Sequence, residues 1–385
     1  MPYLLPRALT KSRDLAFVLA YGDLSHLEIC TVLGERIEKQ ERQLTEITLT
    51  TMKDDKGGYE KLAGIHKVAI PISDLPDFLS QLDDGFNFSV SLYGSGQASE
   101  EEYDEAASEI LATVRESGLR KANLVRPGTG TEVMAKEVAS RQIIDFVLID
   151  LGEKRWLGVT IFVPNAQEFV QRSNERPVVS ADIAISSRLA KLLVNLAGVE
   201  KGQTVLDPFC GSGTILSEAL LAGANCAGVD RDAGRIENTK RNLAWIVKTH
   251  NLTGRHYDLK VGDSTRPGTL TETVDAVISE PIFLPKIDHA LDIDKAKKLI
   301  RNASRLYSDA LYSISDAVKK GGKVVIVTPA LRTSADREVS VLLENVEEAR
   351  LRPFRPASGD FDYPVKISNE KTRWVRRLVY VFERA

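Results

Sequence analysis

The chain has 385 residues, 43% hydrophobic and 27% charged, with a formal net charge of −3 at pH 7. This composition predicts a globular protein of two or three domains and argues against a binder of nucleic acid through overall positive charge. No apolar run is long enough to cross a bilayer and no signal peptide is recognised, so we expect a cytoplasmic protein. Cys30, Cys210 and Cys226 are widely spaced, without a CxxC motif or nearby histidines, which argues against a metal site and a disulfide framework.

Residues 1–83 predict a small N-terminal module of helices and strands. Ser25 and Glu28 have the spacing of a capping box, which places a helix start there. Short apolar or alternating runs predict the strands. The expected elements are a strand at 17–21, a helix at 25–37, strands at 47–51 and 66–71, and a helix at 73–82.

Residues 84–165 predict a second module, with the element order of a small RNA-binding domain. We expect a strand at 86–93, a helix at 101–117, a strand at 122–125, a helix at 132–140, and strands at 143–149 and 156–163. We expect residues 166–187 to form a linker that carries Arg172 and Arg176, and Arg188 follows it directly. Two interpretations stay open: a solvated linker, or a segment that crosses between domains and contacts phosphates.

Residues 188–385 predict the catalytic domain. A helix at 187–197 precedes strands that alternate with turns and helices, which is the pattern of a mostly parallel sheet with right-handed crossovers. The strands are expected at 203–207, 225–230, 258–262, 274–279 and 323–328. The tail at 373–383 predicts a closing strand, antiparallel to one near 348–354.

The most informative stretch is Asp207-Pro-Phe-Cys-Gly-Ser-Gly-Thr214, which joins a short apolar strand to a helix. Glycines at such a turn let a ligand approach backbone N–H groups. The spacing is neither that of the dinucleotide fingerprint nor that of a Walker A loop. Asp230 ends the next strand, where an acid takes ribose hydroxyls. A ligand with a ribose and no demanding phosphate fits S-adenosylmethionine better than NAD or ATP; the alternative is a tight turn with structural glycines.

The turn resembles the first motif of class I amino-group methyltransferases acting on nucleic acid, and nearly the whole chain resembles a family of tRNA guanosine N2-methyltransferases. The resemblance is carried by residues 17–28, 62–68, 169–177 and 189–197 and by the turn itself. It implies an α/β fold: N-terminal ferredoxin-like and THUMP α+β modules joined to a C-terminal Rossmann-like class I methyltransferase domain. It also implies S-adenosylmethionine as cofactor and tRNA as substrate, with the exocyclic amine of guanosine 10 as the target and the THUMP domain gripping the acceptor end.

Cofactor-binding residues follow from these motifs. We expect the methionine end of the cofactor against the turn and the ribose against the second strand. Within the resemblance, Arg231 flanks the adenine and an acid after the third strand meets the adenine amine. The alternative role for Asp263 is a turn cap. The predicted set is Asp207, Phe209, Gly211, Gly213, Thr214, Asp230, Arg231, Asp263 and Ser264.

The catalytic turn departs from the family pattern. Enzymes of this kind use Asp or Asn, then Pro-Pro and an aromatic residue, after the fourth strand: the acid or amide and a backbone carbonyl accept the amine protons, and the ring stacks on a flipped base. Here the turn reads Glu280-Pro281-Ile282-Phe283. We expect Glu280, Pro281 and Phe283 to be catalytic, with Glu280 in the role of the Asp. A different target atom, or weakened catalysis in a protein that mainly binds RNA, are the other two interpretations.

Two other functions remain as alternatives to a tRNA methyltransferase. The enzyme rival is a DNA or ribosomal RNA amino-methyltransferase, and the non-enzyme rival is an RNA-binding homologue with a relict cofactor fold. No pair of histidines has the spacing of metal ligands, so no metal is expected. The basic residues of the last strand either hold RNA backbone or solubilise the sheet edge; they are Lys371, Arg373, Arg376 and Arg377.

Overall fold

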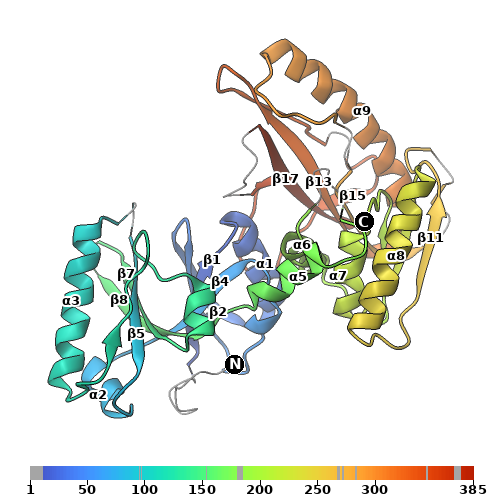
Figure 1. The fold of residues 1–385 in the computed structure, drawn as a ribbon. Coiled ribbons are helices and arrows are strands. Elements are labelled where there is room, and N and C mark those ends of the chain that lie inside the picture. The colour runs from blue at the N-terminus through green and yellow to red at the C-terminus, as the bar shows by residue number, and fades with distance from the viewer. Residues whose placement is uncertain are drawn as a thin grey trace. The chain divides into compact units, whose positions relative to one another are not determined.

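The computed structural model shown in Figure 1 describes residues 12–385, apart from 95, 97, 153, 180–184, 267–268, 271–272, 282–283, 344–345 and 368–373. The chain forms two compact units. The first comprises Met1–Gly22 and Leu33–Ala166, and the second comprises Asp23–Val32 and Gln167–Ala385. Each unit is described by itself.

A single eight-stranded sheet, in the order β2-β3-β1-β4-β8-β7-β5-β6, runs through the first unit. Antiparallel pairing of β4 with β8 joins the strands of the two predicted N-terminal modules. β5 and β7 are parallel, so the chain between them crosses over through a helix. The strands are β1 Asp14–Leu19, β2 Ile37–Leu44, β3 Ile47–Met52, β4 Ile65–Pro71, β5 Asn87–Tyr93, β6 Asn123–Leu124, β7 Ile144–Asp150 and β8 Arg155–Phe162.

The helices up to residue 140 agree with the predicted ones in place, and one strand was not predicted. α1 Asp23–Leu33 begins two residues before the predicted start, and its N-cap is Gly22 without a side-chain hydrogen bond, so the capping box predicted at Ser25 and Glu28 was wrong. The helix ends four residues before the predicted limit and is followed by a 3-10 turn at Gly34–Arg36. The strand that follows, β2, reads IEKQERQL and lies at the edge of the sheet. Edge strands carry charges of this kind, so its apolar pattern is too weak to identify it. The remaining helices are α2 Leu75–Ser80, α3 Glu100–Glu116 and α4 Ala135–Ser140.

The second unit contains a nine-stranded sheet whose main path is β11-β10-β9-β12-β13-β17-β15. The pairs from β11 to β13 are parallel, and β17 is antiparallel to both β13 and β15. This confirms the predicted parallel core and the antiparallel tail. The strands are β9 Thr204–Asp207, β10 Asn225–Asp230, β11 Tyr257–Val261, β12 Val274–Ser279, β13 Val318–Arg332, β14 Glu338–Ser340, β15 Leu351–Pro353, β16 Val365–Lys366 and β17 Val375–Arg384.

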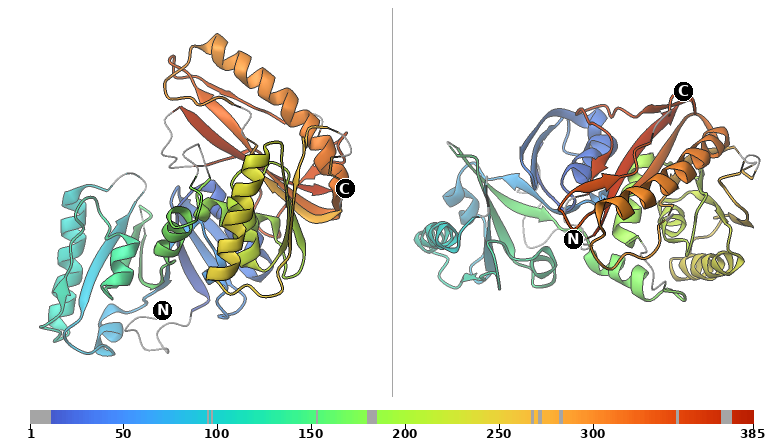
Figure 2. Two further views of the ribbon diagram at one scale, coloured as in Figure 1. Left: turned by 45° about the vertical axis from the view of Figure 1, so that its right-hand side comes forward. Right: turned by 90° about the horizontal axis from the view of Figure 1, so that it is seen from above.

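Helices cover both faces of this sheet (Figure 1, Figure 2). The apolar stripe of α9 Ile293–Ala317 packs on one face against Leu206, Val277 and Val324. Their strand neighbours point to the other face, because successive side chains alternate along a strand. That face meets α6 Ser187–Ala197, α7 Thr214–Ala222 and α8 Ala233–Thr249. The result is a three-layer α/β domain.

The order of the strands reverses between β9 and β12. The sheet grows from β9 through β10 to β11 on one side and from β12 to β13 on the other. Ligands of open α/β sheets bind outside the carboxyl ends of the strands at such a reversal. The residues that follow β9 and β12 are therefore the first place to look for a site.

Part of the predicted linker is helical. α5 Ala166–Asn174 carries Arg172, which is buried and forms an ion pair with Glu218 of α7. Arg172 Nε donates to Glu218 Oε1 at 2.7 Å and its NH2 group donates to Oε2 at 3.2 Å. The solvated-linker interpretation is therefore wrong for Arg172, while the other interpretation, a segment that crosses between domains and contacts phosphates, stays a prediction.

Candidate cofactor and active site

The turn between β9 and α7 requires its glycines. Gly211 and Gly213 have φ of +55° and +79°, a region that L-residues with a side chain avoid. Gly213 also precedes the first residue of α7, and a Cβ there would lie 2.8 Å from the Thr239 Cγ2 atom. Glycine at 213 is therefore required both by the backbone conformation of the turn and by its close packing against α8.

Polar side chains of α8 hold this turn from behind. Thr239 Oγ1 donates to the Gly211 carbonyl at 2.7 Å, and Asn242 Nδ2 donates to the Ser212 carbonyl at 2.9 Å. Neither α8 residue was predicted. A signal existed: both are buried polar residues on the stripe of α8 that also carries Leu243, where apolar residues are expected.

The segment before α6 also contacts the turn. Val178 N donates to Asn242 Oδ1 at 2.9 Å, and Asn242 Nδ2 donates to the Val178 carbonyl at 3.0 Å. The NH1 group of Arg176 donates to Thr214 Oγ1 at 2.6 Å. Burial lowers the pKa of the Arg176 guanidinium. Arg176 therefore contacts the first residue of α7.

Asp207 is the most perturbed carboxyl group of the site. Its side chain is 2% exposed, and its Oδ1 atom accepts the Ser279 hydroxyl at 2.6 Å and the Phe209 N–H at 3.1 Å. Burial raises the pKa of Asp207 to about 7, against the opposing effect of these two hydrogen bonds. Ser279 was not predicted: it ends β12, so its hydroxyl joins the two strands at the reversal point.

Asp230 closes the other side of the turn. Its Oδ2 atom accepts the Gly211 N–H at 3.1 Å, and its Oδ1 atom accepts the Asp232 N–H at 3.0 Å. The side chain is half-buried. An ionised carboxylate has about four acceptor positions, so two remain for hydroxyl donors. Arg231, next to it, is exposed.

The residues after β11 are arranged differently from the prediction. Asp263 caps its own turn, since its Oδ1 atom accepts the Thr265 hydroxyl at 2.7 Å and the Thr265 N–H at 3.2 Å. The Thr265 hydroxyl bond is the first cause of a lowered Asp263 pKa. Ser264 is buried, and its hydroxyl has no hydrogen-bond partner among the described residues. The geometry therefore favours the turn-cap alternative for Asp263.

Glu280 follows β12 directly and forms an ion pair with Arg377 of β17. The two side chains are 12% and 14% exposed. The next residue, Pro281, has its carbonyl held by the buried Tyr307 hydroxyl at 2.6 Å. Phe283 lies outside the described residues. Sequence reasoning missed both Tyr307 and the contact of Arg377 with Glu280, because each depends on an element far along the chain.

The two described members of the basic cluster pair with different carboxylates. Arg377 belongs to the Glu280 turn, while Arg376 is 43% exposed and lies 3.6 Å from the Glu338 carboxylate. Lys371 and Arg373 are outside the described residues. RNA contact by the whole cluster therefore receives no support from the positions of its two described members.

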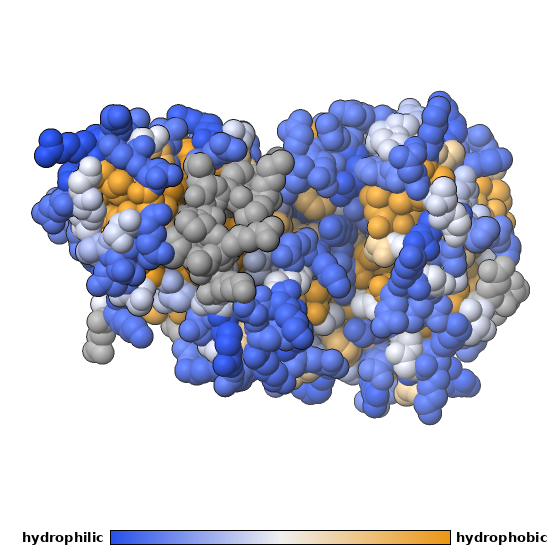
Figure 3. Space-filling model, turned by 90° about the horizontal axis from the view of Figure 1, so that it is seen from below, coloured by the Kyte–Doolittle hydropathy of each residue, from blue (hydrophilic) through white to orange (hydrophobic). Residues whose placement is uncertain are grey.

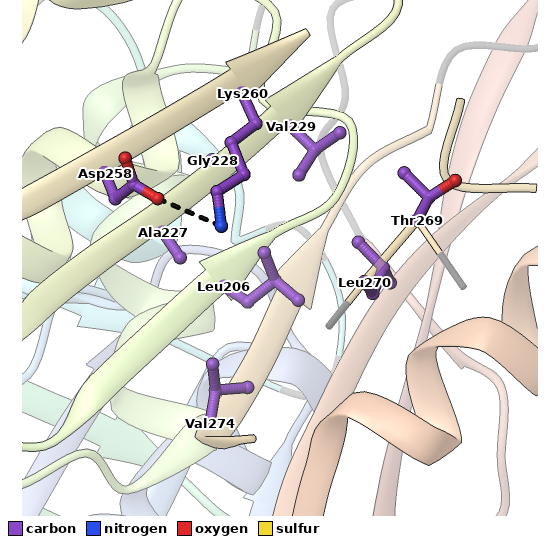
Figure 4. Close-up of a pocket in the computed structure, with 9 residues that line it drawn as sticks. All are labelled: Leu206, Ala227, Gly228, Val229, Asp258, Lys260, Thr269, Leu270 and Val274. Carbon is purple, nitrogen blue, oxygen red and sulfur yellow. Dashed lines mark ion pairs between the residues drawn. The ribbon is translucent and has the colours of Figure 1, made fainter. Parts of the chain in front are cut away.

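A small hollow lies apart from this site, on the sheet face that carries α9 (Figure 4). This partly open hollow has a volume of about 20 Å³, enough for one water molecule. Asp258 and Lys260 form an ion pair of 3.2 Å at its rim. The lining residues are Leu206, Ala227, Gly228, Val229, Asp258, Lys260, Thr269, Leu270 and Val274.

In the described part of the chain, the His, Cys, Asp and Glu side chains form no group of three or more arranged to hold a metal ion. Its helices include none long and apolar enough to span a membrane. The face drawn in Figure 3 is mostly hydrophilic with interspersed apolar patches.

The residues at the strand reversal fit S-adenosylmethionine. A turn with two glycines at positive φ, a helix N-terminus for a carboxylate, and a carboxylate with acceptor positions for ribose hydroxyls occur together. The buried Asp207 carboxyl adds an acceptor for a cationic group. The fit is good for the turn and for Asp230, while Asp263 is already engaged in its own turn.

Comparisons with known proteins agree with this geometry. Residues 176–350 match the family model described as UPF0020, RMKL-like, methyltransferase domain. A tRNA (guanine(10)-N2)-dimethyltransferase of Pyrococcus abyssi is 25% identical over 330 residues, which cover 79% of this chain and 88% of that protein. The Methanothermobacter thermautotrophicus protein of the same name is 32% identical over 150 residues, 38% of this chain and 39% of that protein.

Among solved structures, TrmN from Thermus thermophilus has a TM-score of 0.54 and 17% sequence identity, and the match covers 97% of this chain and 99% of that one. At this identity the likeness shows the fold alone. Together with the family match, it confirms the predicted class I methyltransferase fold and the predicted methyltransferase domain in the second unit.

Proposed function

We propose that this chain, as a member of the tRNA guanosine N2-methyltransferase family to which it belongs, methylates the exocyclic N2 amine of a guanosine in tRNA, with S-adenosylmethionine as the methyl donor. The observation that carries the proposal is the meeting of two turns at the strand reversal. Ser279 joins the Asp207 turn to the Glu280 turn through its 2.6 Å hydrogen bond. A cofactor site and an amine-acceptor site therefore lie side by side.

The cofactor role is assigned to the turn and the strand ends. The N-terminus of α7, with Gly211, Gly213 and Thr214, holds the carboxylate of the methionine part, and Asp207 faces its ammonium group. Asp230 accepts the ribose hydroxyls. The bound cofactor supplies an electrophilic methyl group on a sulfonium. Arg231 beside the adenine remains a prediction, as do Phe209, Asp263 and Ser264 as cofactor contacts.

The Glu280 turn handles the amine. The Glu280 carboxylate and the Pro281 carbonyl accept hydrogen bonds from its protons, which draws the nitrogen lone pair out of conjugation and toward the methyl group. Tyr307 fixes the Pro281 carbonyl from the α9 side. Phe283 is proposed to stack on the flipped base. Catalysis of this kind consists mainly of orientation, so turns anchored on strands suit it.

Binding of tRNA is proposed for the N-terminal part of the chain. Residues 84–165 are assigned as a THUMP-like module, within predicted boundaries of 1–83, 84–165, 166–187 and 188–385. By the names of its relatives, guanosine 10 is the target nucleotide. We also propose a cytoplasmic location, where a tRNA substrate would be available.

Transfer of labelled methyl groups tests the proposal. Purified protein is incubated with labelled S-adenosylmethionine and, separately, an unmodified tRNA transcript, a ribosomal RNA fragment and a DNA duplex. We expect label in tRNA alone, lost in Glu280→Ala and retained in the control Glu237→Ala, which removes an exposed carboxylate of α8. Label in ribosomal RNA or DNA alone, or in none of the three, contradicts the proposal.

A further inference from the structure

The ion pair of Glu280 with Arg377 has no counterpart in the sequence motif, and it lies in the proposed active site. Arg377 comes from β17, where it is in register with Pro329 of β13, and its Nε–H donates to Glu280 Oε1. Resting on the function proposed above, we propose that Arg377 is a positioning residue, which holds the Glu280 carboxylate in the orientation that accepts the substrate amine.

The length of the glutamate side chain explains why such a residue is needed. Compared with aspartate, Glu280 has one more methylene and one more rotatable bond, so its carboxylate has more positions to adopt at the end of β12. Freezing a torsion costs conformational entropy each time substrate binds. A guanidinium fixed on a strand removes that freedom in advance, since its planar donors match a carboxylate.

The geometry of the pair suits an acceptor role for Glu280. The Arg377 Nε–H donates to Glu280 Oε1, one of the two carboxylate oxygens. Because a guanidinium only donates hydrogen bonds, Arg377 orients the Glu280 carboxylate and does not itself accept the protons of the amine.

The two residues that begin the turn, Glu280 and Pro281, are then each held by a rigid element. Tyr307 of α9 donates its hydroxyl to the Pro281 carbonyl at 2.6 Å, and the same hydroxyl lies 3.1 Å from the Val327 carbonyl of β13. Arg377 holds the side chain from β17, the next strand in the sheet. The two acceptors proposed for the amine protons are therefore fixed independently, one by a phenol and the other by a guanidinium.

The alternative is that the ion pair only fastens β17 to the end of β12. In that case any loss of the pair lowers the stability of the protein, and kcat of the folded variants stays at the wild-type value. The variants that separate the roles are Arg377→Met, which keeps the apolar stem, and Arg377→Lys, which keeps the charge. Arg352→Met is the control, because it breaks an exposed pair with Glu383 on the same strand, away from the site.

The experiment measures kcat and the KM for S-adenosylmethionine of each folded variant. We expect Arg377→Met to lower kcat by about 10- to 100-fold, as misplaced reacting groups do, with the KM for the cofactor within about twofold. Arg377→Lys regains part of the loss in kcat, and Arg352→Met matches the wild type.

A double-mutant cycle shows whether Arg377 acts through Glu280. In a Glu280→Gln background, Arg377→Met lowers kcat by less than about twofold if the arginine acts through the carboxylate. The same loss in both backgrounds overturns the inference, as does a wild-type kcat for Arg377→Met. If the wild-type protein is active, either of these two results overturns only the role of Arg377 and leaves the proposed methyltransferase function standing. If the wild-type protein is inactive, both the proposed function and the role of Arg377 are overturned.

Discussion

Replacement of Asp207 by asparagine is expected to stabilise the second unit at neutral and alkaline pH. The Asp207 carboxyl is 2% exposed, and burial raises its pKa from 3.8 to about 7. Because the folded state binds the proton more tightly, the stability from Asp207 is complete below about pH 4 and is lost as the pH rises to about 7. Asparagine is neutral throughout, and its amide oxygen can still accept the Ser279 hydroxyl.

The size of the expected stabilisation follows from the shift in the pKa of Asp207. Three pKa units at 1.36 kcal/mol each give about 4 kcal/mol for ionising this group in the folded protein above pH 7. Between pH 5 and pH 8, the advantage of Asp207→Asn in the free energy of unfolding should grow by about 2–3 kcal/mol. Urea unfolding of both proteins at several pH values, followed by tryptophan fluorescence, measures it. Parallel stability curves for the two proteins would refute the reasoning.

The same residue links cofactor binding to pH. A cationic ammonium group beside Asp207 favours the ionised carboxylate, so binding releases a proton below pH 7. The affinity for S-adenosylmethionine is expected to fall by about tenfold per pH unit below that point, and Asp207→Asn should bind weakly with little pH dependence. Calorimetric titrations in buffers of different ionisation enthalpy detect the proton. Equal affinity at pH 5.5 and pH 8 in the wild type contradicts this role.

Three further substitutions follow from single contacts. Arg172→Met leaves Glu218 buried without its partner and should lower the free energy of unfolding, measured by calorimetry, by about 3–5 kcal/mol. Adding Glu218→Leu should restore much of this loss, and an unchanged Tm for Arg172→Met is the contrary result. Gly213→Ala forces a side chain to φ +79° against Thr239 and should cost about 1–2 kcal/mol and weaken cofactor binding; unaltered affinity speaks against it. Tyr307→Phe removes a donor shared by two carbonyls and should cost about 1–3 kcal/mol and lower kcat with cofactor affinity intact; wild-type turnover counts against it.

The sequence predicts the second unit well where the pattern is local. β9, β10 and β12 are short apolar runs that each end in a polar residue, so their ends, with Asp207 and Asp230, are identifiable without coordinates. The glycine turn is equally local, because its backbone conformation demands the residue type. Glu280 is identified by its place directly after the fourth predicted strand and by the proline and phenylalanine that follow, which match the catalytic turn of the family it resembles.

What the sequence leaves unpredicted depends on contacts between distant segments. Arg172 and Glu218 are 46 residues apart, and Arg377 is 97 residues from Glu280, so no spacing rule connects them. Ser279 looks like an ordinary strand residue until the pairing of β12 with β9 brings it to Asp207. In each case the sheet order creates the contact.

The most direct test of the proposed function is nucleoside analysis of an unmodified tRNA transcript after reaction with the protein and S-adenosylmethionine. The account predicts N2-methylated guanosine, located at position 10 by fragment mass spectrometry, and its absence when Glu280→Ala is used. Methylation of another base or atom, or N2-methylguanosine formed equally well by Glu280→Ala, would contradict it.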